Sequence, residues 1–164
     1  MNRCLFLLPL LLANTVYAAT TLTGRCVDVL DGDTYKAEVV IDGEQKIITV
    51  RCSGIDAPEK GQHYADEARE LLRQLILNRN ITIQYSKIDA YKRYVAKTLV
   101  DTPCGTIWAE KALLDAGCAW HFTRYSKSKE LQKVEDTARE RRVGLWQIPD
   151  PQPPWEYRKS RPSY

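Results

Sequence analysis

Two Asp-Gly turns divide the stretch from Leu22 to Val50 into three short strands. The stretch is rich in Val, Ile, Thr and Tyr and is interrupted at residues 31–33 and 42–43, a pattern typical of strands separated by turns. Asp42 and Gly43 lie between apolar runs at 37–41 and 47–50, and both residue types tolerate positive φ. The sequence therefore predicts a tight hairpin between the second and third strands.

One helix, two further strands and two further helices are expected after these strands. The first helix has apolar residues at helical spacing along one face: Ala68, Leu71, Leu72, Leu75 and Ile76. Residues 81–85 and 94–100 are predicted to pair as strands, followed by a turn at 102–105. Helices are expected over 107–116 and 129–142, because Gly117 and Gly144 stand where each would end.

The predicted order, β-β-β-α-β-β-α-α, indicates an α+β fold with a five-stranded OB-type β-barrel and three α-helices. A chain of 164 residues is the size of one domain, which we place at residues 19–147. Residues 148–164 contain five prolines and are expected to form an extended surface tail rather than a helix or central strand. Trp155 is expected to dock on the barrel, since an indole is costly to expose; binding a partner is the alternative.

Residues 1–18 have the features of a signal peptide. Arg3 precedes the apolar run at 5–13, and Val16-Tyr17-Ala18 forms a cleavage site that places the mature start near Ala19. A buried N-terminal strand or helix is the alternative. The run is too short to span a bilayer and no other stretch approaches 20 apolar residues. We therefore expect an exported protein, periplasmic or secreted, with no membrane anchor.

The cysteines and the net charge exclude two further classes of protein, zinc domains and histone-like nucleic-acid binders. Cys4 leaves with the signal peptide, so the mature chain keeps four cysteines: Cys26, Cys52, Cys104 and Cys118. An oxidising compartment permits disulfides among them, with three connectivities open, and free buried thiols are the alternative. Two His residues and no C-x-x-C pair argue against a zinc domain. A net charge of +3 argues against a histone-like binder.

The stretches Asp31-Gly32-Asp33-Thr34 and 51–59 carry the candidate chemistry. Asp33 and Asp56 lie at the ends of strands that a barrel can bring together, and two carboxylates with a backbone carbonyl and water suit Ca²⁺. Each of these features has a simpler explanation when it is taken alone. The Asp-Gly pair could form only a turn, Arg51 could form a surface ion pair, and Glu59 could start a loop. Together they supply a Lewis acid, a guanidinium and a base, which phosphodiester hydrolysis needs along with a second guanidinium. Arg93 is the best candidate for that second group.

These motifs resemble those of the staphylococcal (micrococcal) nuclease family: D-G-D-T, then R-x-x-x-x-D-x-P-E, then D-x-Y-x-R. The resemblance covers about residues 22–146. It implies an OB-fold barrel with three helices and Ca²⁺-dependent cleavage of DNA and RNA to products ending in 3′-phosphate. By position, it implies a calcium site at Asp33, Asp56 and the Ala57 carbonyl, with Asp31 and Thr34 supporting the ligands.

The resemblance also implies roles around the scissile phosphate. Arg51 and Arg93 would clamp that phosphate, and Glu59 would be the general base. The substrate-binding residues would be Tyr91, Tyr125 and Lys92, although the lysine stands two positions after the family's place for it, where this chain has Ala90. We expect nucleic acid as the partner, no obligate protein partner, and a monomer.

A catalytically inactive OB-fold module that only binds nucleic acid, peptide or sugar is the competing hypothesis. The fold alone does not separate the two. Retention of both arginines and all three carboxylates favours the enzyme. We expect His63 and His121 to be non-catalytic, and Trp108, Trp120 and Trp146 to pack in the core or at the barrel edge.

Overall fold

A computed structural model of the chain describes residues 20–160, so the predicted signal peptide lies outside the described residues. Five strands form a closed barrel, because β3 pairs with β2 on one side and, in parallel, with β6 on the other. The strands of the barrel are β1 (Thr20–Val29), β2 (Thr34–Ile41), β3 (Glu44–Cys52), β5 (Asn80–Ile88) and β6 (Tyr94–Thr102). The predicted barrel is confirmed.

The β2–β3 hairpin turns at the predicted residues. Ile41 pairs with Glu44, and the two residues between them, Asp42 and Gly43, have φ values of 55° and 80°. Both values lie in the left-handed region, which Asp and Gly enter more readily than other residues.

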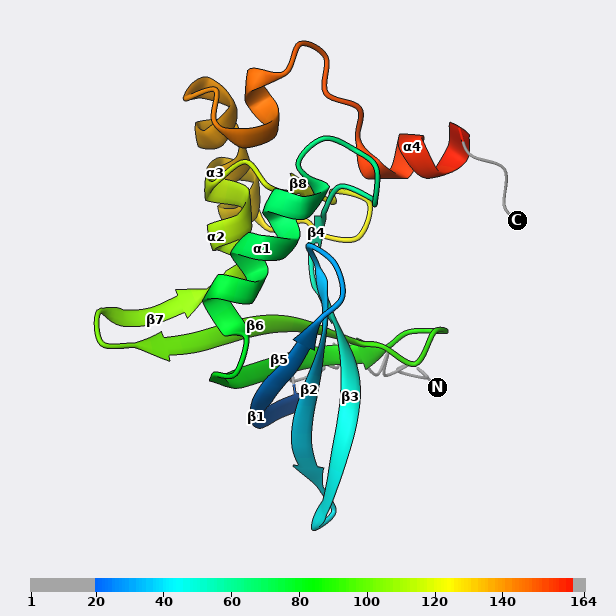
Figure 1. The fold of residues 1–164 in the computed structure, drawn as a ribbon, viewed down its shortest axis with the longest axis vertical. Helices are drawn as coiled ribbons and strands as arrows, with labels where there is room; N and C mark the ends of the chain where they lie inside the picture. Colours follow the sequence, from blue (N-terminus) through cyan, green and yellow to red (C-terminus); the bar gives the residue numbers. More distant parts are fainter. Residues whose placement is uncertain (1–19, 161–164) are drawn as a thin grey trace, which may run out of the picture.

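Three helices gather at one end of the barrel (Figure 1). They are α1 (Ala65–Ile76), α2 (Ala109–Asp115) and α3 (Lys129–Glu140). The α1 stripe points inward, with Ala68, Leu72 and Ile76 fully buried, where they join the barrel side chains in one core. Burying a Leu or Ile side chain contributes about 1.5–3 kcal/mol, so this stripe fixes the helix to the strands.

Residues 105–108 differ from the prediction, which began a helix at Ile107. They form a short strand, β7 (Gly105–Trp108), in which Ile107 pairs with Val100 of β6. Pairing with a neighbouring strand overrides the local helical pattern, so α2 starts two residues later, at Ala109. A second small sheet joins β4 (Ile55–Asp56) to β8 (Trp120–His121). A 3₁₀ turn, η1 (Gly144–Gln147), follows α3.

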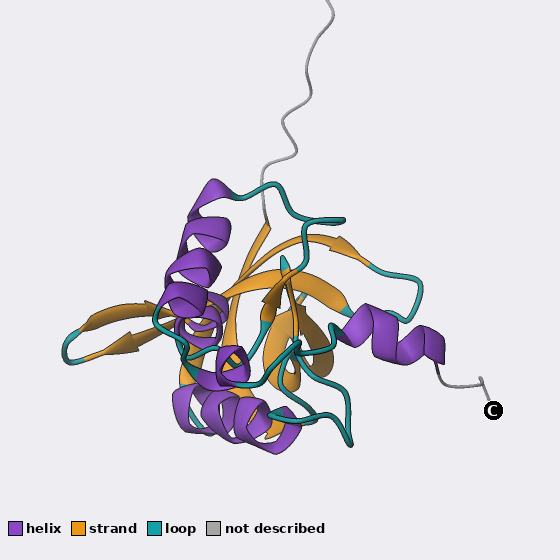
Figure 2. Ribbon diagram, turned by 90° about the horizontal axis from the view of Figure 1, so that it is seen from above, coloured by secondary structure: helices purple, strands orange, loops and turns teal. Residues whose placement is uncertain are grey.

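The prediction that the tail contains no helix is wrong. Residues Pro154–Ser160 form a seven-residue helix, α4. The helix is compatible with the prolines because Pro154 is its first residue, where a helix leaves the backbone N–H without a partner anyway. Figures 1 and 2 both show α4 on the opposite side of the molecule from the group formed by α1, α2 and α3. The docking of Trp155 is confirmed: its ring stacks on Phe122 at 5.2 Å and meets Trp120 edge-on at 5.7 Å.

The four cysteines of the described residues are all free thiols, three buried and one, Cys104, exposed. Trp120 and Trp146 are buried and pack edge to face at 4.5 Å, as expected of core aromatics. Between residues 20 and 160, no helix is long and apolar enough to cross a membrane.

Candidate active site

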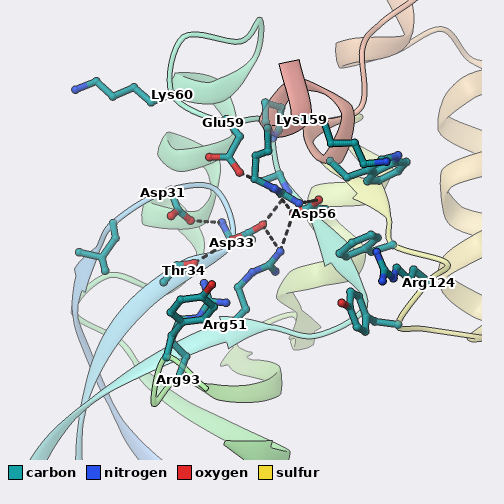
Figure 3. Close-up of a pocket in the computed structure, with 18 residues that line it drawn as sticks. Asp31, Asp33, Thr34, Arg51, Asp56, Glu59, Lys60, Arg93, Arg124 and Lys159 are labelled. Carbon is teal, nitrogen blue, oxygen red and sulfur yellow. Dashed lines mark hydrogen bonds and ion pairs between the residues drawn. The ribbon is translucent and has the colours of Figure 1, made fainter. Parts of the chain in front are cut away.

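A cleft of about 790 Å³ opens beside the barrel, between the β1–β2 turn, the end of β3, the β5–β6 turn and α4 (Figure 3). All but one of the residues predicted for the site line this cleft. They are Asp31, Asp33, Thr34, Arg51, Asp56, Ala57, Glu59, Tyr91, Arg93 and Tyr125. Lys92, the exception, is an exposed residue of the β5–β6 turn with a φ of 61°.

The β1–β2 turn holds its acidic residues through short hydrogen bonds. The Asp33 N–H donates to Oδ1 of Asp31 at 3.0 Å, and the Thr34 hydroxyl donates to Oδ1 of Asp33 at 3.0 Å. Gly32 is required between them, because a Cβ there would lie 2.7 Å from the Cβ atoms of both Ala57 and Ala68. The turn therefore presents the Asp33 carboxylate in a fixed orientation.

Asp33 and Asp56 converge although they lie 23 positions apart in the sequence. The Ala57 N–H donates to Oδ2 of Asp33 at 2.8 Å, which ties the β1–β2 turn to the chain after β4. Nη2 of Arg51 lies 2.9 Å from Oδ2 of Asp33 and 2.8 Å from Oδ1 of Asp56. One guanidinium nitrogen therefore bridges the two carboxylates.

The other terminal nitrogen of Arg51 fixes the guanidinium to the backbone. Nη1 donates to the carbonyls of Cys52 at 2.7 Å and Ile55 at 2.9 Å. Only 14% of the Arg51 side chain is exposed. The charged group is thus held rigidly at the floor of the cleft.

Burial and mutual repulsion shift the protonation of the acidic groups. Burial, followed by the charge of Asp33, raises the pKa of Asp31 to about 6. Burial also raises the pKa of Asp56, although hydrogen bonding to Arg158 and the charge of Arg51 oppose it. Burial alone would lower the pKa of Arg51, but Asp33 and Asp56 outweigh it and raise that pKa. The cluster of carboxylates favours a bound cation.

The donor set fits a hard cation such as Ca²⁺. The side chains of Asp33 and Asp56 and the neighbouring Ala57 carbonyl supply oxygen only, which calcium prefers. In the described part of the chain no group of three or more His, Cys, Asp or Glu residues forms a ready metal cage. Carbonyl oxygens and water would therefore complete the coordination.

Arg93 is held at the other wall of the cleft by Asp89, which sequence reasoning had not assigned a role. Nη2 and Nε of Arg93 lie 2.8 and 2.9 Å from Oδ2 of Asp89. Oδ1 of Asp89 accepts the N–H groups of Tyr91 and Arg93, both at 2.9 Å. These bonds shape the β5–β6 turn. The Arg93 guanidinium lies 5.3 Å from the ring centroid of Tyr91, which is 82% exposed.

Glu59 lies at the rim, and the tail reaches it. Its N–H donates to the Gln62 side chain at 2.8 Å, and Gln62 in turn donates to the Gln152 carbonyl at 3.0 Å. The Glu59 carboxylate pairs with Arg158 of α4. Arg158 also makes a two-point contact with Asp56, at 2.7 and 3.3 Å.

Several cations and one aromatic group of the cleft had no role assigned from the sequence: Lys60, Phe122, Arg124, Arg158 and Lys159. Trp155 was expected to dock, but not to line the cleft. The residues from α4 could not be placed, because the tail was expected to lack regular structure. His121 lies outside the cleft: it is buried and its ring bonds to Gln132 and Ser126.

Sequence comparisons show which known proteins the chain is similar to. A sequence model described as "Staphylococcal nuclease homologue" matches residues 49–148. An "Uncharacterized endonuclease" of Escherichia coli O157:H7 is 35% identical over 135 residues, which cover 82% of this chain and 84% of that protein.

Plant proteins show similar identity over a shorter share of their length. "Staphylococcal-like nuclease CAN1" of Arabidopsis thaliana is 36% identical over 116 residues, 71% of this chain and 35% of that protein. "Probable staphylococcal-like nuclease CAN1" of Oryza sativa subsp. japonica is 37% identical over 112 residues, which cover 68% of this chain and 33% of that protein. The chain thus spans about a third of the length of these two relatives.

Proposed function

The chain belongs to the staphylococcal nuclease family, and on that basis we propose that it is a calcium-dependent phosphodiesterase that cleaves DNA and RNA to products ending in 3′-phosphate. The observation that carries this proposal is the bridge from Arg51 to Asp33 and Asp56, with Arg93 on the facing wall of the same cleft. A site that only bound nucleic acid would not require buried carboxylates at its floor.

Calcium would be held by Asp33, Asp56 and the Ala57 carbonyl, with Asp31 and Thr34 fixing the orientation of Asp33. When bound, the ion would act as a Lewis acid on the phosphoryl oxygens. Arg93 would offer two N–H groups to the phosphate, whose negative charge grows in the transition state. Both terminal nitrogens of Arg51 already bond to two carbonyls and to the Asp33 and Asp56 carboxylates, so Arg51 would act through its positive charge beside the phosphate. Their anchoring by backbone carbonyls and by Asp89 pre-organises both groups.

Glu59 would be the general base. Its carboxylate would accept the proton of the attacking water. It lies at the rim of the cleft, three residues after Asp56, on a loop that Pro58 stiffens. This position allows Glu59 to act on a water next to the phosphate that the arginines hold.

The exposed aromatic groups support an unpaired substrate. Tyr91 and Tyr125 line the cleft and are 82% and 65% exposed, so their rings are free to contact bases or phosphates. Stacking of aromatic rings on bases is typical of proteins that bind single strands. We propose DNA and RNA without stable base pairing as the substrates, with Lys92 adding charge beside the strand.

Export and a monomeric state complete the proposal. The signal-peptide features of residues 1–18 support secretion or a periplasmic location.

The proposal is tested with chain 19–164 and a fluorescent single-stranded oligonucleotide in calcium. We expect shortened products whose mobility changes after a phosphatase removes a 3′-phosphate. Binding of the oligonucleotide without any cleavage would instead identify the silent OB-fold module.

A further inference from the structure

Helix α4 reaches the cleft from the far end of the chain. Trp155 anchors it by stacking on Phe122, with ring planes only 1° from parallel. The segment before the helix is held by the bond from Gln62 to the Gln152 carbonyl at 3.0 Å. These two contacts place the next turn of α4, with Arg158, over the acidic floor of the cleft.

Arg158 contacts two of the three carboxylates on which the proposed chemistry depends. Nη2 donates to Oδ2 of Asp56 at 2.7 Å, and Nη1 donates to Oδ1 of the same carboxylate at 3.3 Å. Nη1 also donates to Oε1 of Glu59. Because Arg51 donates to Oδ1 of Asp56 as well, both oxygens of a carboxylate that is only 2% exposed are engaged.

A guanidinium and a metal ion that bind the same Asp56 carboxylate weaken each other's binding. The two-point contact occupies both oxygens, and its positive charge repels a second cation at the same group. Arg51 conflicts less with an ion, because it contacts only Oδ1 of Asp56 and only Oδ2 of Asp33, which leaves the other oxygen of each carboxylate to the ion. Its other nitrogen is fixed to the Cys52 and Ile55 carbonyls. The Arg158 side chain is 43% exposed, and among the residues that the structure describes its bonds join it only to Asp56 and Glu59, so its release would leave the barrel wall intact.

We propose that α4 is an autoinhibitory latch in which Arg158 competes with calcium for Asp56 and covers Glu59 until the ion displaces it. This inference rests on the proposed function, since it takes Asp56 as a calcium ligand. By linkage, calcium loosens the Arg158 contact by the same factor by which Arg158 weakens calcium binding. The calcium concentration for half-maximal activity would then be higher than an open site requires.

Calorimetric titration of calcium tests the competition without measuring activity. We expect Arg158→Gln to bind calcium about tenfold more tightly than the wild type, the effect of losing one ion pair in a partly buried site. Lys159→Gln is the matched control, because it removes one positive charge from the next residue of α4. Within residues 20–160, Lys159 forms no ion pair, and its loss should change calcium affinity by less than about twofold.

Hydrogen exchange supplies a second readout in the wild-type protein. Calcium should speed exchange of the amide groups in residues 155–160, because the helix loses its contact with Asp56. Equal calcium affinity of wild type and Arg158→Gln, with unchanged exchange in α4, would overturn the latch and leave the calcium site standing. No calcium binding by either protein would overturn the calcium site itself, and the latch with it.

Discussion

Nη2 of Arg51 lies 2.9 Å from Oδ2 of Asp33, so a side chain near the end of β3 neutralises a carboxylate in the β1–β2 turn. The same nitrogen contacts Asp56, and Arg51 therefore holds the site together as well as facing the phosphate. Replacing Arg51 by Lys would lose both carbonyl bonds and lower stability along with activity. Arg93, whose side chain is 32% exposed and paired only in a surface turn, is the cleaner test of the phosphate clamp.

Arg93→Lys should lower kcat by about 10³-fold, because an ammonium keeps the charge but loses the planar two-point contact with phosphate. Its free energy of unfolding should change by less than about 1 kcal/mol, the range of exposed ion pairs. Steady-state kinetics and urea denaturation measure the two effects. Arg73→Lys, at a surface pair with Glu70 outside the cleft, is the matched control. Equal kcat in both variants would remove Arg93 from the catalytic residues.

Asp33→Asn and Asp56→Asn should each weaken calcium binding, because a hard cation loses a charged oxygen while the shape of the site is kept. We expect at least about a tenfold loss of affinity in each, since 1.4 kcal/mol corresponds to tenfold. Asp42→Asn, in the β2–β3 turn away from the cleft, is the control. Wild-type affinity in both cleft variants would place the metal elsewhere.

Glu59→Gln should fold normally and still bind calcium, yet cleave about 10²- to 10⁴-fold more slowly, because an amide cannot accept the proton of water. The measurement is the pH dependence of kcat at saturating substrate and calcium. If Glu59 only shapes the loop after Pro58, melting temperature and substrate affinity should change together with the rate. Retained turnover with an unaltered pH profile would refute the base role and leave the metal and arginine assignments intact.

The buried Glu110 side chain should make the stability of the protein depend on pH. It is fully buried and accepts the Thr98 N–H on both carboxylate oxygens, at 3.0 and 3.1 Å. Burial raises its pKa from 4.5 to about 7. Between these two values the folded protein retains a proton that the unfolded chain releases, so stability falls as the pH rises through that window.

Urea denaturation from pH 4.5 to 7 should therefore show a loss of up to about 3 kcal/mol that is absent from Glu110→Gln. Asp31 contributes a slope of the same sign, because its pKa is also raised. The contribution of Glu110 is therefore the difference between the pH dependences of the unfolding free energy of the wild type and of Glu110→Gln. Parallel slopes for wild type and variant would show that Glu110 ionises as easily when folded as when unfolded.

Local patterns were sufficient to predict the barrel, and the family resemblance supplied most of the residues that line the cleft. The turn at Asp42-Gly43 and the apolar stripe on α1 act within a few residues, and the motif residues lie at strand ends that barrel closure brings together. The local pattern predicts a helix at Ile107, but Ile107 pairs with Val100 in a strand. That pairing depends on tertiary structure, which the local pattern does not contain. Asp89 is part of a motif, but its grip on Arg93 follows from turn geometry that spacing does not define.

The tail shows the limit of sequence reasoning most clearly. Its five prolines led to the wrong prediction that it contains no helix, because Pro154 can begin a short one. The contact between Arg158 and Asp56 joins residues 102 positions apart. No periodicity or spacing in the sequence encodes such a contact, which depends on where Trp155 docks.

Release of acid-soluble nucleotides from denatured DNA tests the central claim most directly. Chain 19–164 is compared in calcium and in EDTA, beside an Asp33→Asn/Arg93→Lys double variant prepared in the same way to reveal any contaminating nuclease. The account predicts release by the wild type in calcium, none above background in EDTA, and a rate at least about 10³-fold lower for the double variant. Equal release by wild type and double variant, or undiminished release in EDTA, would contradict it.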